Sequence, residues 1–278
     1  MDPTWCLFPK FYRHLSPEEL AGLLAQVGLD ETAVVVRDGY SVTHEALASE
    51  LPGFLRALRG AGGRACSAVT NFMPAGLVAD PTPLAVMADN GITEFRMGCF
   101  WYDGPDVRGV LARCREEMRR LAPVCRRHGV RCVYQLHHNS LVANSAGAYA
   151  LVRNLPAEAI GVMIDPGNQS HDGWENWHRS ARLLGEYLAG VGVKDTAVAR
   201  DPSAAGDPSK GWQRTWCPLD EGVTDWHDVA GALAGVDFAG TFLFMPFYDP
   251  DDPDGMIGKL KREVRYLRNI VAEADRQA

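Results

Sequence analysis

The sequence predicts an α/β protein built as a single (β/α)8 TIM barrel with eight parallel strands. Short apolar runs rich in β-branched residues alternate with longer segments of helical period about eight times along the chain, which is typical of repeated βα units. Eight such units close a parallel barrel. No linker or change of composition divides the chain, so residues 1–278 are expected to form one domain.

The expected strands are short and largely apolar. In chain order they are Trp5–Phe8, Ala33–Arg37, Ala65–Thr70, Ile92–Gly98, Arg131–His137, Gly161–Asp165, Leu188–Lys194 and Gly240–Met245. Side chains that do chemistry in such barrels project from the carboxyl ends of the strands. The residues at these ends are therefore the candidate site residues.

Two of the intervening helices have clear sequence signals. Ser16 precedes Pro17 and two glutamates, the pattern of an N-cap followed by proline in the first helical position. The clearest helix is Val107–His128, in which apolar residues recur every three or four positions with Arg and Glu between them. Gly129 is expected to end that helix.

The segment Ala199–Gly222 interrupts the alternation. It is polar and rich in Pro, Gly and Ser, so it is expected to be a long loop after the seventh strand. A loop in that place lies at the functional face of a barrel. Both a partial lid and a plain surface loop remain open as interpretations.

The composition is that of a globular protein with an acidic balance. Hydrophobic residues make up 46% of the chain and charged residues 23%, which is enough apolar material for a large core. A net charge of −7 argues against nucleic acids and acidic lipid surfaces as partners. The expected partner is a small-molecule substrate, no nucleotide cofactor is expected, and association into a homo-oligomer is left open.

Targeting signals and cysteines bear on the compartment. The sequence opens without an apolar leader, and no window approaches 18 uncharged apolar residues, so a cytoplasmic protein without a membrane partner is expected. The seven cysteines form an odd set with no CxxC pair. That pattern favours reduced, mostly buried thiols over disulfides or a zinc cluster.

Polar side chains gather at the ends of strands five, six and seven. The two-residue period of a strand places Gln135 and His137 on the same face of strand five. Strand six ends in Asp165, and strand seven ends in Lys194 and Asp195. A lone His at a strand end or an Asp before Pro-Gly is usually structural, but together they could bind a divalent ion. The last pair could equally be a surface ion pair.

Arginine and tryptophan residues offer further candidates. Arg96 lies in an apolar run near the end of strand four, so an anion or carbonyl contact is expected, or a buried ion pair with Asp38 or Glu94. Five tryptophans could line a cleft or a subunit contact, although aromatic side chains more often pack in cores. They are Trp174, Trp177, Trp212, Trp216 and Trp226.

Five short segments in chain order carry a resemblance to a known family. The chain resembles the sugar phosphate isomerase/epimerase superfamily, the xylose isomerase-like TIM barrels, over nearly its whole length. The segments are Val36-Arg37-Asp38-Gly39, Tyr134-Gln135-Leu136-His137-His138, Asp165-Pro166-Gly167-Asn168, Val193-Lys194-Asp195 and Glu221-Gly222-Val223-Thr224-Asp225-Trp226.

The resemblance implies a divalent ion, commonly manganese, magnesium, cobalt or zinc, held by four strand ends. His137 and Asp165 match the ligands expected from strands five and six. Gly192 and Met245 stand at the other two positions, and neither offers a hard oxygen or an imidazole nitrogen. The implied site is therefore weak or absent unless His171 joins it. Replacing the glycine by His and the methionine by Glu is expected to restore it.

The resemblance also implies a function: proton transfer next to the carbonyl of a small polyhydroxylated or keto substrate, by isomerase or lyase chemistry. The expected catalytic residues are His137, Asp165, Lys194 and Arg96, the last two stabilising negative charge. The expected substrate-binding residues are Gln135, His138, Asn168, Arg37 and Trp174. The alternative is a barrel that has lost catalysis and binds a ligand or partner subunit, which the two missing metal ligands favour.

Overall fold

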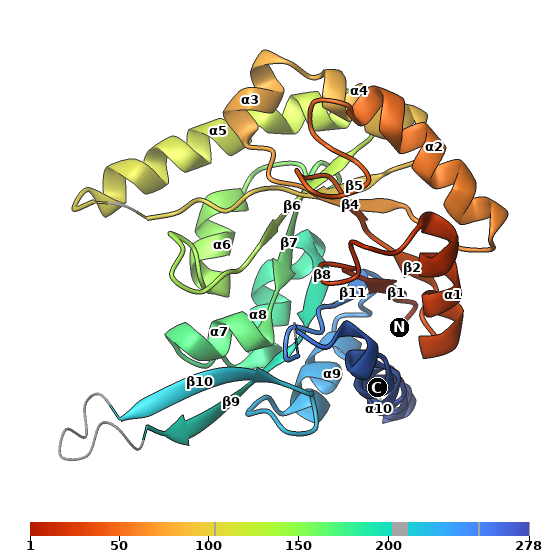
Figure 1. The fold of residues 1–278 in the computed structure, drawn as a ribbon. Coiled ribbons are helices and arrows are strands. Elements are labelled where there is room, and N and C mark those ends of the chain that lie inside the picture. The colour runs from red at the N-terminus through yellow and green to blue at the C-terminus, as the bar shows by residue number, and fades with distance from the viewer. Residues whose placement is uncertain (103, 202–210, 250, 278) are drawn as a thin grey trace.

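The computed structural model describes residues 1–102, 104–201, 211–249 and 251–277, which fold into a barrel of parallel strands surrounded by helices (Figure 1). Within these residues the strands of the barrel sheet are β1 (Thr4–Leu7), β2 (Glu31–Thr32), β3 (Val34–Val35), β4 (Ser67–Val69), β5 (Glu94–Arg96), β6 (Arg131–Gln135), β7 (Ile160–Ile164), β8 (Leu188–Val193) and β11 (Thr241–Phe244). The helices are α1 (Pro17–Val27), α2 (Leu47–Gly60), α3 (Pro74–Ala79), α4 (Thr82–Asp89), α5 (Val107–His128), α6 (Ser145–Val152), α7 (Pro166–Asp172), α8 (Trp177–Leu184), α9 (Trp226–Ala234), α10 (Pro253–Gln277) and the short 3-10 helix η1 (Gly185–Tyr187).

The sheet closes through one interrupted strand. Its order is β2-β1-β11-β8-β7-β6-β5-β4-β3, and the pairings between these neighbours are all parallel. Only Ala33 separates β2 from β3, so one extended stretch pairs with β1 at its start and with β4 at its end. The predicted eight-stranded parallel barrel is confirmed, with its second strand divided at this residue.

Side-chain alternation fills the barrel and sets its rim. Inward-facing residues form an apolar interior that includes Phe8, Val35, Val69, Val133 and Met163. A second, larger core lies between the strands and the surrounding helices. Because successive side chains point to opposite faces of a strand, the residue two positions beyond each interior residue points inward again at the carboxyl end. That rim layer carries the site described below.

Both helix signals are confirmed. Ser16 caps α1 and forms a capping box with Glu19: its hydroxyl accepts from the Glu19 amide at 3.2 Å, and its own amide donates to the Glu19 carboxylate at 2.8 Å. α5 ends at Gly129, which adopts the left-handed conformation with φ 67°.

The seven cysteines are free thiols. Among the described residues no helix is both long enough and apolar enough to span a membrane.

The predicted loop over residues 199–222 was wrong for residues 199–200 and 212–217, which lie in strands, whereas residues 218–222 form a loop with turns. β9 (Asp195–Arg200) and β10 (Trp212–Cys217) pair antiparallel, while residues 202–210 lie outside the described part of the chain. The polar composition misled the prediction because the two strands obtain their backbone hydrogen bonds from each other rather than from a buried sheet. Figure 1 shows this hairpin projecting from the barrel past α7.

Asp195 anchors the segment that follows the hairpin. Its buried carboxylate accepts hydrogen bonds from the Thr196 amide at 2.7 Å, the Thr224 hydroxyl at 2.9 Å and the indole N–H of Trp226 at 2.9 Å. A surface pair between Lys194 and Asp195 is therefore ruled out, because both side chains are buried. The closing segment from Glu221 to Trp226 wraps around this carboxylate, and so its role is structural.

A second buried carboxylate ties α10 to the barrel. Glu263 accepts from the Leu219 amide at 2.9 Å and from the Tyr248 hydroxyl at 2.6 Å. Burial raises the pKa of Glu263 to about 8 from an ordinary value of 4.5. The protonated carboxyl is thus favoured in the folded state, and the stability it provides is lost as the pH rises through 8.

Replacing Glu263 by Gln should make the protein less sensitive to alkaline pH. The amide oxygen still accepts from the Leu219 N–H, and the amide N–H can donate to the Tyr248 oxygen in place of the hydrogen bond that the hydroxyl donates to Glu263. The side chain then carries no charge to desolvate. We expect the difference in melting temperature, variant minus wild type, to increase between pH 6 and pH 9, by about 3 °C or more at pH 9. Thermal scans at several pH values measure it, with exposed Glu273→Gln on the same helix as the control. An equal pH dependence in both proteins would contradict the assignment.

Candidate active site

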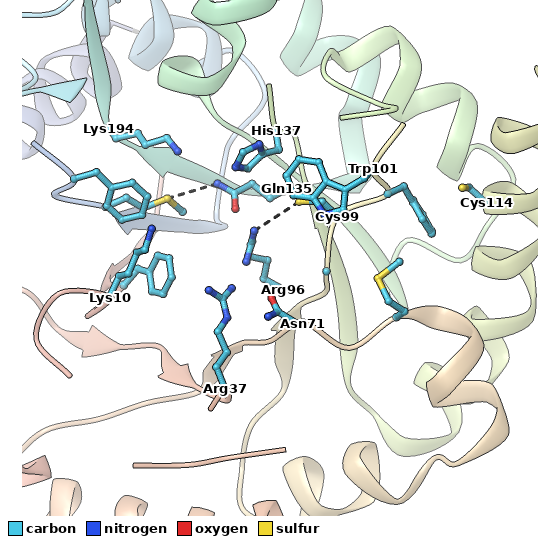
Figure 2. Close-up of a pocket in the computed structure, with 16 residues that line it drawn as sticks. Lys10, Arg37, Asn71, Arg96, Cys99, Trp101, Cys114, Gln135, His137 and Lys194 are labelled. Carbon is cyan, nitrogen blue, oxygen red and sulfur yellow. Dashed lines mark hydrogen bonds between the residues drawn. The ribbon is translucent and has the colours of Figure 1, made fainter. Parts of the chain in front are cut away.

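A cavity of about 720 Å³ opens at the carboxyl ends of the barrel strands (Figure 2). Its polar lining comes from the ends or following loops of β1, β3, β4, β5, β6 and β8. Aromatic side chains of Phe8, Trp101 and Phe247 complete the wall. The polar lining residues are Lys10, Arg37, Asn71, Arg96, Gln135, His137 and Lys194.

The lining is cationic. Lys10, Arg37, Arg96 and Lys194 all line the cavity, and no carboxylate is among the described residues that line it. Arg96 makes no ion pair with Asp38 or Glu94 among the described residues, so that expected alternative is not realised. Its guanidinium instead reaches Cys99 Sγ at 3.8 Å and points into the cavity (Figure 2).

A buried carboxylate lies beneath the cavity. Asp165 is fully buried; its Oδ1 accepts from the Asn168 amide at 2.8 Å, and its Oδ2 accepts from the Asn168 side chain at 2.9 Å and from Gln135 Nε2. Lys194 Nζ lies 3.4 Å from the same Oδ2. Burial raises the pKa of Asp165, and the nearby Lys194 ammonium counteracts this. With three N–H donors directed at it, the carboxylate is surrounded by groups that suit its ionised form.

Lys194 is enclosed by the carboxylate and by aromatic rings. Its ammonium lies 4.4 Å from the ring centre of Trp216 and 5.0 Å from that of Phe247. Burial lowers the pKa of Lys194, while Asp165 raises it and Arg96 lowers it further. The contacts with Asp165 on one side and with the π faces on the other favour the charged ammonium against the cost of its burial at the floor of the cavity.

His137 presents an uncharged imidazole to the cavity. Its Nδ1 lies 2.9 Å from the backbone oxygen of His138, and since a carbonyl oxygen only accepts, Nδ1 carries the proton. Nε2 therefore has a free lone pair. Burial lowers the pKa of His137 to about 4, and the nearby Lys194 and Arg96 charges add to the effect. The ring is neutral at physiological pH and can accept a proton.

The side chains that converge at the floor do not form a metal site. Gln135 Nε2 donates to Asp165 and lies 3.5 Å from Met245 Sδ, so Gln135 at the end of β6, rather than His137, is the neighbour of the carboxylate. A Cβ at Gly192 would lie 2.6 Å from Asp165 Oδ2 and 3.2 Å from Gln135 Nε2. The four converging positions thus hold an amide, a carboxylate, a glycine and a thioether. Among the described residues there is no group of three or more His, Cys, Asp or Glu side chains that could hold a metal ion.

The residue set implied for a divalent ion therefore does not fit one here. A single carboxylate supplies the only hard, charged ligand among the four, and an ammonium already lies against it. His171, the further expected ligand, lies 3.3 Å from the Thr196 hydroxyl, stacks on His138 and packs at a tilt against Trp216. Burial lowers the pKa of His171 to about 4. It belongs to the wall behind the cavity.

The remaining expected site residues divide into two groups. Asn168 is fully buried and supports the floor, because its side chain binds Asp165 and the Leu136 carbonyl and lies 2.9 Å from His138 Nδ1. Arg37 lines the cavity. Trp174 does not: it is 70% exposed and borders a separate hollow beside Glu175.

The sequence prediction missed several lining residues. Lys10, Asn71, Cys99 and Trp101 line the cavity although none was proposed as a site residue. The strand period holds the signal for two of them: Lys10 lies two residues beyond the interior Phe8, and Asn71 lies two beyond the interior Val69. The other two lie in the loop after β5, whose course no periodicity predicts. Burial raises the pKa of the Cys99 thiol, consistent with an unreactive thiol.

Comparisons with known proteins agree with this architecture. A family model described as "Xylose isomerase-like TIM barrel" matches residues 86–270. Among solved structures, an L-ribulose 3-epimerase superposes with a TM-score of 0.73 at 13% identity, over 100% of this chain and 97% of that one. A D-psicose 3-epimerase determined in the presence of D-fructose gives 0.71 at 15% identity, over 96% and 99%. A xylose isomerase-like TIM barrel protein from Mycobacterium smegmatis, in complex with magnesium, gives 0.70 at 14% identity, over 99% and 98%. Likenesses at these identities show the fold.

One curated sequence also aligns with part of the chain. Autophagy protein 5 of Penicillium rubens is 29% identical over 140 residues, which are 45% of this chain and 43% of that protein. The chain thus spans less than half the length of that relative.

Manganese should bind weakly to the purified protein, and chelation should leave its properties unchanged. Elemental analysis after dialysis against manganese should find well below one ion per chain, because one carboxylate gives little affinity. The sequence-based expectation that Gly192→His with Met245→Glu restores a site meets a steric and an electrostatic obstacle in the structure. A Cβ at position 192 would crowd Asp165, and the Lys194 ammonium would repel the ion. Adding Lys194→Met removes the electrostatic obstacle, so the triple variant should bind manganese more tightly than the double variant. Tight stoichiometric manganese in the unmodified chain would contradict this site description.

Proposed function

The chain belongs to the xylose isomerase-like TIM barrel family, and on that premise we propose an isomerase- or epimerase-like enzyme that works without a divalent ion. Its substrate is a small polyhydroxylated or keto compound, and its reaction is proton transfer next to a carbonyl. The observation that carries the proposal is the buried Lys194 ammonium, 3.4 Å from Asp165 at the floor of the cavity. Structural neighbours that include two sugar epimerases support the substrate class.

Lys194 takes the role of the electrophile. An ammonium fixed by Asp165 and by the faces of Trp216 and Phe247 needs little reorganisation when negative charge develops on a substrate oxygen. Its burial excludes water, which strengthens the interaction. Asp165 acts as a positioning residue because its carboxylate holds the ammonium in place.

His137 takes the role of the base. Its Nε2 accepts the proton from the carbon next to the carbonyl, and the electron pair of that C–H bond moves to the carbonyl oxygen, where Lys194 stabilises the enediolate. Return of the proton to the former carbonyl carbon completes an isomerisation when the proton of the neighbouring hydroxyl passes to the former carbonyl oxygen, so that the new carbonyl forms on the carbon that was deprotonated. Return of the proton to the same carbon gives exchange with solvent. Gln135 and Met245 offer no second base across the floor. The site therefore suits one-base isomerisation or dehydration better than two-base epimerisation.

A binding function is the second candidate. The same observation favours it: the floor holds a neutral amide and a thioether where two further acid or base groups would otherwise act. Under this alternative the cavity would hold a sugar or keto acid without turning it over. The two functions differ in whether a bound substrate exchanges its protons.

Proton exchange at the substrate carbon tests the proposed base. In D2O with chelator present, NMR should show deuterium entering the carbon next to the carbonyl of a ketose or keto acid that binds. His137→Gln should slow this exchange by about 100-fold or more. For the wild type the rate should fall as the pH approaches 4, since protonation of His137 removes the lone pair. His227→Gln, at an exposed position of α9 away from the cavity, serves as the control. If ketoses and keto acids bind but none of them exchanges a proton, the proposed enzyme function is overturned and the binding function is favoured.

Paired substitutions test the electrophile. Lys194→Met alone should destabilise the fold by about 3–5 kcal/mol, because it leaves the buried Asp165 carboxylate without its cation. Adding Asp165→Asn should restore much of that stability while deuterium exchange stays about 100-fold or more below wild type. Thermal melts and the same NMR assay measure both effects. A folded double variant with wild-type exchange would rule out the role of Lys194.

A further inference from the structure

Three cations gather in the part of the cavity formed by the N-terminal half of the barrel. Arg37 follows β3, Arg96 ends β5 and Lys10 follows β1. In the strand order, the arc from β3 to β5 is centred opposite β8, the strand that precedes Lys194. Figure 2 shows Arg37 reaching into the cavity from the side opposite His137 and Lys194, with Arg96 between them.

These cations lack partners of opposite charge in the described part of the chain. No ion pair includes Lys10, Arg37 or Arg96 there. Arg37 Nε and both Nε and Nη1 of Arg96 are buried without a hydrogen-bond partner. Lys10 lies over the ring of Phe247 at 4.5 Å, and Arg37 lies over that of Phe8 at 5.7 Å. The aromatic faces thus lie against the two charged heads, but they leave the buried arginine N–H groups without an acceptor.

The arrangement is costly in the free protein. Burial and, to a lesser extent, the Arg96 charge lower the pKa of Arg37 to about 10. Burial likewise lowers the pKa of Lys10, with both arginines adding to the effect. Buried donors without acceptors and like charges side by side both destabilise a fold. An anion with several oxygen acceptors would relieve both penalties at once.

We propose that Arg37, Arg96 and Lys10 form a subsite for an anionic group of the substrate, a carboxylate or a phosphate. The anionic end of the substrate lies at this subsite, and its reacting carbonyl lies toward Lys194 and His137. Only this orientation of the substrate rests on the proposed function. The substrate is then a keto or hydroxy acid, or a phosphorylated sugar, and neutral sugars bind poorly. The planar forks of two arginines suit a multi-oxygen anion better than single hydroxyl groups.

Isothermal titration calorimetry with three six-carbon keto compounds tests the subsite. The probes are D-fructose, which is neutral, 5-keto-D-gluconate, which carries a carboxylate, and D-fructose 6-phosphate. At least one anionic probe should bind about tenfold or more tightly than D-fructose, since charge-assisted hydrogen bonds contribute about 1.5–3 kcal/mol. The probe that gains more identifies whether the subsite takes a carboxylate or a phosphate.

Charge-removing variants locate the effect. Arg37→Met and Arg96→Met should each reduce the affinity for the preferred anion about tenfold or more, and should change the affinity for D-fructose little. Arg37→Lys should keep part of the preference, because it keeps the charge and loses the fork. Arg126→Met, on the exposed face of α5, is the matched control and should leave binding unchanged.

The subsite and the proposed enzyme function are tested by different measurements, the affinity for the anionic probes and deuterium exchange, so either can fail without the other. If D-fructose binds as tightly as both anionic probes, or if Arg37→Met and Arg96→Met leave the anion preference intact, the subsite is overturned whether or not proton exchange occurs. If the preference and its loss in the variants are observed while no probe exchanges deuterium, the subsite stands and the proposed enzyme fails.

Discussion

The buried ion pair between Lys194 and Asp165 is the constraint on which the site depends. A carboxylate with no solvent exposure requires full hydrogen bonding and a cation, and here it receives N–H groups from Asn168 and Gln135 and the ammonium at 3.4 Å. Those contacts occupy the centre of the barrel floor. A divalent ion would have to displace the ammonium and would find one hard ligand there, so the electrostatics of this pair determine what chemistry the cavity can support.

The position of the pair follows from the closure of the barrel. Parallel strands that close on themselves bring inward-facing residues from every strand into one layer at the carboxyl rim. The barrel interior below this rim layer is apolar. The rim layer itself carries amide, imidazole, guanidinium and ammonium groups. Packing thus stabilises the lower half of the barrel, and the upper half retains buried charges at a cost in stability. Such a division is expected where function requires groups that the fold alone would disfavour.

The hairpin β9–β10 contributes to the site as well as to the outer surface. Trp216 of β10 covers Lys194 at 4.4 Å and contacts the ring of His171, which in turn stacks on His138 at 4.5 Å. Asp195 holds the start of the hairpin and the following segment together. The hairpin therefore forms one wall around Lys194 and is not a separate surface feature.

The sequence by itself determined the barrel and the neighbourhood of the site. Hydrophobic period and strand spacing gave all eight strands, because both are local properties that burial selects residue by residue. It also placed Arg96, His137 and Lys194 at the rim. Tertiary structure decided that Gln135 rather than His137 contacts Asp165, that Lys194 is buried against that carboxylate and that Lys10 and Arg37 join Arg96. These relations connect residues far apart in the chain, so only the register of the closed barrel could fix them.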